Sequence, residues 1–294
     1  MTAYRFCRSD DLGLLAEAHE HCRGPEHADA QPLDRARLKE LIRELDLWSS
    51  SSMVAFESTE PVGVLLGCKR DSATLVLALR VHPAHRRKGH ARHLLTSLSS
   101  KLAILGPPRL VAEVPADRPA ALALFDACGW RREEALVDLR RAPQADDRSA
   151  TAGTDSPIAP LALEEALASG LLTPSTAGWK RDPQAFARQA DRLGAIGFFS
   201  AERLEAVVVH RALHARPAAQ RDLEILALGA TEGELGRLGV ALLLADVQRR
   251  AGNAPLSLPR LSQAEIATPA TPLFELFFEP NSEYVRFATE AKSA

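Results

Sequence analysis

Several features are scarce in this sequence, and each scarcity excludes a class of protein. Its 294 residues contain four cysteines without C-x-x-C spacing, which argues against a disulfide framework or a cysteine zinc site. No stretch approaches the roughly 18 consecutive apolar residues of a membrane span, and the first residues lack a signal-peptide core. The formal net charge is -2, so the protein lacks the excess of basic residues that is typical of proteins that bind nucleic acid. We therefore expect a cytoplasmic globular protein with neither membrane nor nucleic-acid partners.

Large apolar residues are also scarce between positions 142 and 160, where Ala, Ser, Thr, Asp and Pro dominate. Such a stretch cannot bury enough apolar surface to hold a fixed structure. It therefore predicts a domain boundary, with one domain at 1–141, a linker at 142–159 and a second domain at 160–294.

What is present in the first half is an alternation of helical and strand patterns. Helical apolar spacing fills the region from Leu12 to Trp48. Strand signals mark a hairpin at 51–68, a strand at 73–81 that reads as buried on both faces, and strands at 109–114 and 132–139. Further helices are predicted at 89–105 and 119–128. The pattern predicts an α/β fold.

The second half repeats this outline, with a hairpin at 197–210 and a buried strand at 222–229. Two triplets and one pair of similar residues recur at a constant offset of 149 positions, which pairs 77–79 with 226–228, 94–95 with 243–244, and 124–126 with 273–275. A constant offset requires intervening segments of equal total length. The sequence therefore predicts a tandem duplication.

One segment concentrates positive charge, VHPAHRRKGHARHLL at 81–95, and it follows a strand and begins a helix. Basic residues at a helix N-terminus oppose the helix dipole unless an anion binds there. No carboxylate stands between Asp71 and Glu113, so the window carries charge of one sign. We expect a phosphate-binding loop, with a solvated basic helix start or a nucleic-acid patch as the alternatives.

The segment resembles the coenzyme A pyrophosphate loop of the GNAT N-acetyltransferase superfamily, here with Arg86, Gly89 and Ala91 in the Arg-x-x-Gly-x-Ala pattern. The segment ALALFDACGWRREE at 121–134 is similar to a second motif of that family. The resemblance covers residues 1 to about 141. It implies a GNAT-like domain there, a central mixed β-sheet flanked by helices, and with the repeat it implies two such domains in tandem. It also implies acetyl-CoA as cosubstrate and a small-molecule or protein amine as acceptor.

The resemblance further implies which residues contact coenzyme A. Backbone groups at the end of the strand would bind the pantetheine and polarise the thioester carbonyl. The coenzyme A contacts expected in this way are Leu79, Arg80, Val81, Arg86, Arg87, Lys88, Gly89, His90, Ala91, Arg92 and Phe125. The loop is flanked by His82, His85, His90 and His93, which are expected to face solvent unless one of them reaches a phosphate or the acceptor.

Glu113 is the candidate general base, because RLVAEVPADRPAALALF resembles the corresponding segment of ribosomal-protein N-acetyltransferases. The alternative is a structural glutamate at a sheet edge. Two positions depart from the family: Arg118 replaces an Asn, and Phe125 replaces the Tyr that protonates the leaving thiolate. Water can protonate a coenzyme A thiolate near neutral pH, so activity is still expected. Cys128 is interpreted as a packing residue.

No metal site is predicted, because His19, His21, Cys22 and His27 do not share one helix face. In the second domain, the offset puts Leu235, Leu238 and Val240 opposite Arg86, Gly89 and Ala91. We therefore expect this domain to be degenerate and to shape the acceptor site, although Gly236 and Gly239 could restore a glycine loop in a shifted register. The chain is expected to be a monomer or homodimer.

The sequence favours an acetyl-CoA-dependent N-acetyltransferase with its active site in the N-terminal domain. The competing hypothesis is a non-catalytic acyl-CoA-binding pseudoenzyme that acts as a sensor or scaffold. It rests on the missing Tyr and on the alternative interpretation of Glu113.

Overall fold

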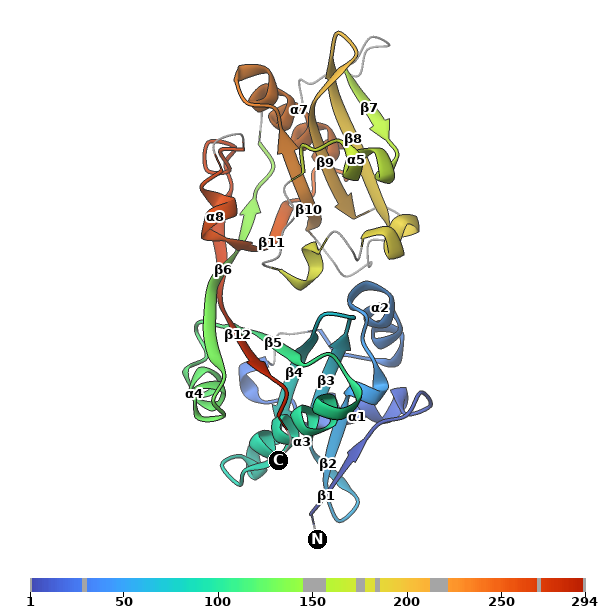
Figure 1. The fold of residues 1–294 in the computed structure, drawn as a ribbon, viewed down its shortest axis with the longest axis vertical. Coiled ribbons are helices and arrows are strands. Elements are labelled where there is room, and N and C mark those ends of the chain that lie inside the picture. Colours follow the sequence, from blue (N-terminus) through green and yellow to red (C-terminus); the bar gives the residue numbers. More distant parts are fainter. Residues whose placement is uncertain are drawn as a thin grey trace. The chain divides into compact units, whose positions relative to one another are not determined.

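The computed structural model describes residues 2–27, 31–144, 157–172, 178–182, 186–211, 222–268 and 271–292. It divides the chain into two compact units. Unit 1 comprises Met1–Glu134 together with Val285–Ala294, and unit 2 comprises Ala135–Tyr284. Each unit contains a mixed β-sheet with helices packed on it, as predicted (Figure 1). In the described part of the chain, no helix combines the length and apolar character needed to span a membrane.

The sheet of unit 1 is antiparallel at one edge and parallel at its centre. Its strands are β1 (Thr2–Phe6), β2 (Met53–Glu57), β3 (Glu60–Lys69), β4 (Thr74–Val81), β5 (Arg109–Pro115) and the C-terminal half of β12 (Glu279–Glu290). They follow one another in that order, and β4 runs parallel to β5. The short edge strand β1 is absent from the sequence prediction.

Helices cover both faces of this sheet. They are α1 (Leu12–His21), α2 (Arg35–Leu45), α3 (His90–Leu105) and α4 (Pro119–Ala127). One face packs on α3 and α4 through a core that includes Leu79, Leu94 and Phe125. The next residue along β4, Arg80, points to the opposite face, where its Nη1 donates to the carbonyl oxygen of His19 on α1. The two faces therefore differ: α3 and α4 lie on one, and α1 lies on the other.

Unit 2 has the same plan. Its strands are the part of β6 (Arg131–Arg141) from Ala135 onward, β7 (Ile158–Leu161), β8 (Leu193–Ser200), β9 (Arg203–Arg211), β10 (Leu223–Ala230) and β11 (Leu256–Ser262). The order is β6-β11-β10-β9-β8-β7, and β10 runs parallel to β11. Its helices include α5 (Leu163–Ala168), α7 (Glu234–Arg250) and α8 (Gln263–Ile266). Because β7 begins at Ile158, the predicted linker 142–159 is too long at its C-terminal end, and residues 145–156 lie outside the described part.

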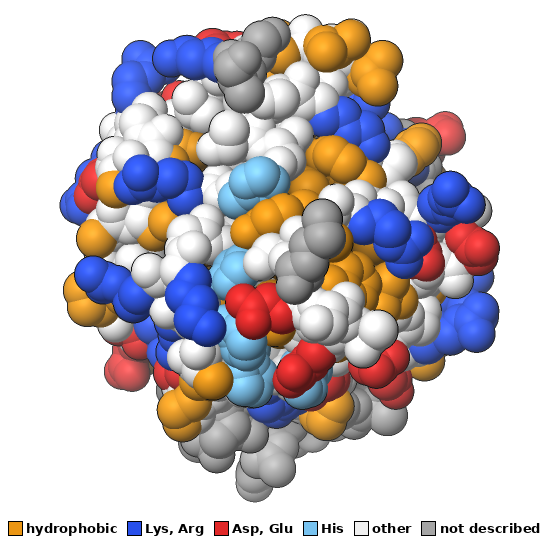
Figure 2. Space-filling view, turned by 90° about the horizontal axis from the view of Figure 1, so that it is seen from below, with side chains coloured by type: hydrophobic (Ala, Val, Ile, Leu, Met, Phe, Trp, Pro, Cys, Tyr) orange, Lys and Arg blue, Asp and Glu red, His pale blue; other side chains and the backbone are white. Residues whose placement is uncertain are grey.

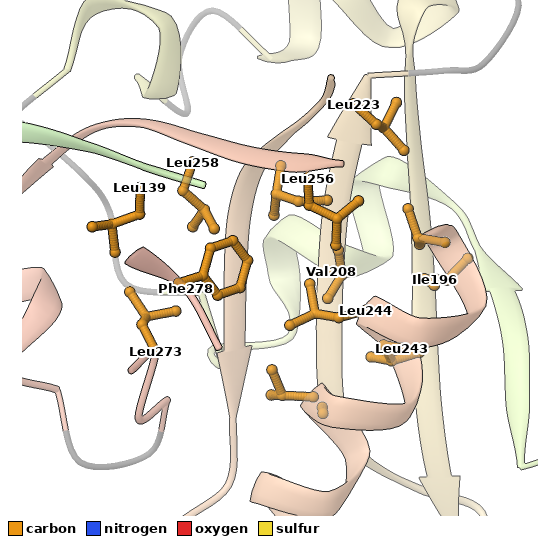
Figure 3. Close-up of a cluster of buried hydrophobic side chains, with 14 of the residues drawn as sticks. Leu139, Ile196, Val208, Leu223, Leu243, Leu244, Leu256, Leu258, Leu273 and Phe278 are labelled. Atoms are coloured by element: carbon orange, nitrogen blue, oxygen red, sulfur yellow. The ribbon is translucent and has the colours of Figure 1, made fainter. Parts of the chain in front are cut away.

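The core of unit 2 lies mainly between its sheet and α7 (Figure 3). Leu243 and Leu244 of α7 pack against strand residues such as Val208 and Leu256. Leu273 and Phe278 close the same cluster. Phe274, which the repeat offset pairs with the buried Phe125, is 56% exposed. The repeat pairing therefore does not give Phe274 the buried position of Phe125, because the neighbouring Leu273 fills the core instead.

Each unit is completed by a strand from the distant part of the chain. Residues of β6 from Ala135 onward pair with β11 of unit 2. The half of β12 from Val285 belongs to unit 1, where Phe287 is buried against Phe125 and the Ala291 amide donates to the Pro108 carbonyl oxygen. The units of the structure thus differ from the predicted domains 1–141 and 160–294, because the last strand of each repeat joins the other unit.

Candidate functional site

Strand β4 leaves its parallel neighbour partway along its length. In the described register, β4 pairs with β5 from Thr74 to Val76, whereas its pairing with β3 continues to Val81. Opposite β3 the register shifts at Leu77, because Leu66 faces Ala78 and Gly67 faces Val76. Leu77 is therefore a β-bulge, which bends a strand and ends local pairing. From this residue the edge of β4 toward β5 is open, and β4 is buried on both faces only before the bulge, not over its whole length as predicted.

The predicted backbone contacts lie on this open edge. Leu79, Arg80 and Val81 follow the bulge and are partly buried. Their backbone groups on the β5 side have no strand partner in the described pairing. Backbone N–H and C=O groups in such a position need a partner from elsewhere, and an extended amide-bearing ligand would provide one.

The loop after β4 leads directly into the N-terminus of α3. A short turn, Pro83–His85, begins it, and Gly89 caps the helix with φ 89°. This φ favours glycine, and among the described residues nothing lies within 4 Å of the position that a Cβ would occupy. No side-chain cap reaches the helix from the described chain. The first amides of α3 and the positive end of its dipole therefore face open space.

Exposed cations surround these amides. Arg86, Arg87, Lys88 and Arg92 are all exposed, and His90 and Ala91 begin the helix between them. Arg87 adopts a left-handed φ of 65°, which turns the chain before the helix. Free amides at a helix N-terminus together with flexible cations match the chemistry of a diphosphate. The residues present thus fit the diphosphate of coenzyme A.

Two carboxylates reach this loop from distant parts of the chain. The Glu26 carboxylate lies 2.5 Å from Arg86 Nη2. The Glu57 carboxylate lies 3.4 Å from His85 Nδ1 and 3.7 Å from His90 Nε2. The prediction of a local field of one sign is therefore wrong, because it considered only neighbours in sequence. An anion that binds Arg86 must compete with Glu26.

Glu113 stands where β4 and β5 diverge. It follows Ala112, the last residue of β5 that pairs with β4. Its neighbours Ala112 and Val114 belong to the core under α3, so strand alternation turns Glu113 to the opposite face, on which α1 packs. Glu113 is partly buried, and it has an interaction partner within the protein. The position combines access to the open edge of β4 with a carboxylate.

The face of α1 supplies groups that the sequence analysis did not assign. His19 is buried beside Arg80, and burial followed by the Arg80 charge lowers the pKa of His19 to about 4. His19 Nδ1 lies 3.1 Å from Glu20 Oε1, which also accepts from the Leu33 amide at 2.9 Å. His19 is therefore neutral at pH 7. It was considered only as a metal ligand, and nothing in its local sequence indicates this environment.

Phe125 lies in the core and not on the open edge of β4. It is 4% exposed, packs edge-on against Trp130 at 5.0 Å between ring centroids, and stacks on Phe287 at 5.3 Å. Cys128 is partly buried, and burial raises the pKa of its thiol. Both residues make packing contacts, and neither offers an ionised or hydroxyl group.

The corresponding part of unit 2 repeats the bulge. In the described register, β10 pairs with β11 at Leu223 and Glu224, and its register with β9 shifts at Leu226, which is offset by 149 from Leu77. The loop differs, because α7 already begins at Glu234. Leu235 and Leu238, which the offset pairs with Arg86 and Gly89, are exposed helical residues there.

A segment of the chain occupies the space between β10 and β11. The turn Trp179–Arg181 contacts both strands. Arg181, which is buried, donates from Nε to the carbonyl oxygen of the bulge residue Leu226 at 2.9 Å and from Nη1 to Glu265 Oε1 at 2.7 Å. Lys180 Nζ lies 2.6 Å from Glu224. In unit 2, a turn of the protein itself therefore contacts both strands and the bulge residue where they diverge.

Comparison with known proteins agrees with this architecture. Residues 15–130 match the model of the acetyltransferase (GNAT) family, whose members are acetyltransferases. No protein of curated function matches the sequence.

Among solved structures, the chain is similar to a tandem GNAT protein from the clavulanic acid biosynthesis pathway, with 18% identity, 100% of both chains covered and a TM-score of 0.66. It is also similar to a GCN5-related N-acetyltransferase from Sphaerobacter thermophilus, with 16% identity, coverage of 99% of this chain and 96% of that chain, and a TM-score of 0.65. At identities this low, the structural similarity establishes the fold alone. The chain therefore has the tandem GNAT fold, and residues 15–130 of its N-terminal unit match the acetyltransferase (GNAT) family model.

Proposed function

We propose that unit 1 is an acetyl-CoA-dependent N-acetyltransferase, which moves the acetyl group directly to the amine of a small molecule or a protein. The observation that carries the proposal is the continuity of two features. The edge of β4 that opens at the Leu77 bulge leads straight into the open N-terminus of α3. An extended acyl carrier with a diphosphate at one end has the shape and charge to occupy both.

The loop and the strand edge would then bind different parts of acetyl-CoA. The amides of α3 and the side chains of Arg86, Arg87, Lys88 and Arg92 hold the diphosphate. The open edge of β4 binds the pantetheine. One of its backbone N–H groups donates a hydrogen bond to the thioester carbonyl oxygen, where negative charge develops. Acetyl-CoA, when bound, would supply the acetyl thioester and leave as coenzyme A. Binding at Arg86 displaces its contact with Glu26.

Glu113 takes the proton that the acceptor ammonium must lose before or during attack, directly or through a water molecule. Its place at the divergence of β4 and β5 supports this role. Phe125 has no proton to give, so solvent protonates the departing thiolate. Coenzyme A thiolate needs no strong acid near neutral pH.

Binding of coenzyme A is tested by calorimetric titration of the full chain. Gly89→Glu and Arg86→Ala should each lower the affinity by about tenfold or more, and wild-type affinity should fall as salt rises. Lys39→Ala, an exposed cation on α2, is the matched control and should bind as wild type. Wild-type affinity in both loop variants would exclude this loop as the diphosphate site.

Catalysis is tested with a panel of small amines and peptides. Glu113→Gln should lower the turnover by roughly 10² or more, the usual size for the loss of a general base, and leave coenzyme A affinity within about twofold. Glu17→Gln, an exposed carboxylate on α1, should have wild-type turnover. If Glu113→Gln keeps wild-type turnover at saturating amine, the base lies elsewhere.

The buried Phe125 favours a second candidate, a pseudoenzyme that binds acyl-CoA as a sensor or scaffold. A protein that binds coenzyme A tightly but acetylates no amine in the panel would support this candidate.

We further propose that one chain binds one coenzyme A and that unit 2 shapes or shields the acceptor site. The turn Trp179–Arg181 supports the stoichiometry, because it contacts both parallel strands of unit 2 and hydrogen-bonds the backbone of the bulge. Titration should give a stoichiometry near one. Two equivalent sites would contradict this proposal without affecting the proposal for unit 1.

A further inference from the structure

Three side chains of unit 1 converge beside the phosphate loop. They are Glu57 at the end of β2, His85 in the turn after β4, and His90 at the start of α3. One nitrogen or carboxylate oxygen from each lies within 4.8 Å of the others. Figure 2 shows histidine side chains gathered with carboxylates on one face of the molecule. From this geometry we propose that Glu57, His85 and His90 bind a divalent transition-metal ion of the Zn²⁺ class.

The separations suit a shared ion better than hydrogen bonds. His90 Nε2 and Glu57 Oε1 are 3.7 Å apart, and His85 Nδ1 and Glu57 Oε2 are 3.4 Å apart. In a tetrahedral zinc site with bonds of about 2.0–2.1 Å, neighbouring ligand atoms are about 3.4 Å apart. The two separations from Glu57 are thus within about 0.3 Å of this value, although they involve different carboxylate oxygens, and no pair of ligand atoms is more than 4.8 Å apart. Small rotations of these side chains would bring all three ligands onto one ion.

His90 supplies independent support. It is 4% exposed, and its buried Nε2 has no hydrogen-bond partner within the described chain. A buried nitrogen without a partner is costly, and coordination to a metal removes the cost. Its other nitrogen, Nδ1, lies 2.9 Å from the hydroxyl of Tyr4. In the tautomer whose Nδ1 donates to Tyr4, Nε2 carries the lone pair that a metal ion needs, and metal-bound histidines usually donate their other ring N–H in this way.

The donor set determines the class of ion. Two imidazoles and one carboxylate suit zinc and neighbouring first-row metals, whereas Ca²⁺ and Mg²⁺ prefer oxygen ligands alone. The three protein ligands leave a fourth position for water. Lys88 Nζ lies 3.5 Å from His85 Nδ1 and opposes a cation there, but this exposed side chain can turn into solvent.

The ion would hold the loop at both ends. His85 precedes the residues 86–89, His90 follows them, and Glu57 fixes both to the sheet. Metal binding therefore orders the loop that carries Arg86 and Gly89 before any anion arrives. No metal was expected from the sequence, because the ligands come from three separate elements.

The test uses the full chain after treatment with a chelator, titrated with Zn²⁺ by calorimetry and with Co²⁺ by visible absorption. Wild type should bind about one ion per chain, give the absorption bands of tetrahedral Co²⁺, and melt at a higher temperature with Zn²⁺. His85→Ala and Glu57→Gln should each lower the affinity by about 100-fold or more and abolish the thermal shift, and Tyr4→Phe should lower the affinity by about tenfold.

His93→Ala is the matched control, because this exposed histidine stacks on Tyr4 and lies outside the cluster. It should bind as wild type, and Lys88→Ala should bind more tightly. Stoichiometric binding by His85→Ala and Glu57→Gln with wild-type affinity, or no binding by wild type, would overturn the proposal.

Discussion

Phe287→Ala should destabilise unit 1, although Phe287 lies almost at the end of the sequence. The ring is 0% exposed and stacks on Phe125 within the core under α3 and α4. Truncating such a ring removes buried apolar surface and leaves a cavity, which costs about 3–5 kcal/mol. With a urea dependence of about 2 kcal/mol per molar, the unfolding midpoint of unit 1 should fall by about 2 M.

The assay is hydrogen exchange of α3 peptides as a function of urea, because a chain with two units need not unfold in one step. Ile104→Ala is the control, since Ile104 belongs to the same unit and is 78% exposed. It should change the free energy of unfolding by less than about 0.5 kcal/mol. Equal midpoints for the two variants would show that the C-terminal strand does not stabilise unit 1.

Further outcomes are expected at four positions. Gly89→Ala and Gly129→Ala should each cost unit 1 about 1–2 kcal/mol, because both glycines have positive φ and open space around them, but only Gly89→Ala should weaken coenzyme A binding; equal affinities would refute the assigned loop. Arg181→Ala should destabilise unit 2 by about 1–3 kcal/mol, because it removes the side chain that donates to the Leu226 carbonyl oxygen and to the partly buried Glu265 carboxylate, and unchanged exchange in β10 would contradict this. Burial lowers the pKa of His19 to about 4, so the unfolded state binds more protons between pH 6.5 and 4; unit 1 should lose up to about 3 kcal/mol as pH falls through that range, and His19→Gln should flatten this dependence. An unchanged slope in His19→Gln would assign the loss to other groups.

The sequence predicts the part of the site that is local. The strand, basic loop and helix from Thr74 to Leu105 form within a residue or two of the predicted positions, because periodicity and a single glycine specify them. The groups that modify the loop could not be predicted in this way. Glu26 and Glu57 come from other elements, and only the folded chain brings them to Arg86 and His90.

The sequence also could not predict which unit receives the last strand of each repeat, β6 or β12. The residues of β6 and β12 have the apolar pattern of a final strand, and that pattern is the same whichever sheet receives it. The repeat offset of 149 is kept by the bulges at Leu77 and Leu226, because the position of a bulge depends on the lengths of the paired strands and not on their side chains. It fails at Phe274, where a neighbouring residue fills the core instead.

The half of β12 that belongs to unit 1 is synthesised after all the other strands of that unit. Every other strand of unit 1 has left the ribosome long before Val285, Phe287 and Ala288 are made, so its core waits with one side uncovered. Contacts between residues so far apart in the chain form slowly, and an incomplete sheet edge is prone to wrong pairing in the meantime. The N-terminal unit, although it begins first in the sequence, therefore completes its fold only after all residues of unit 2 have been made.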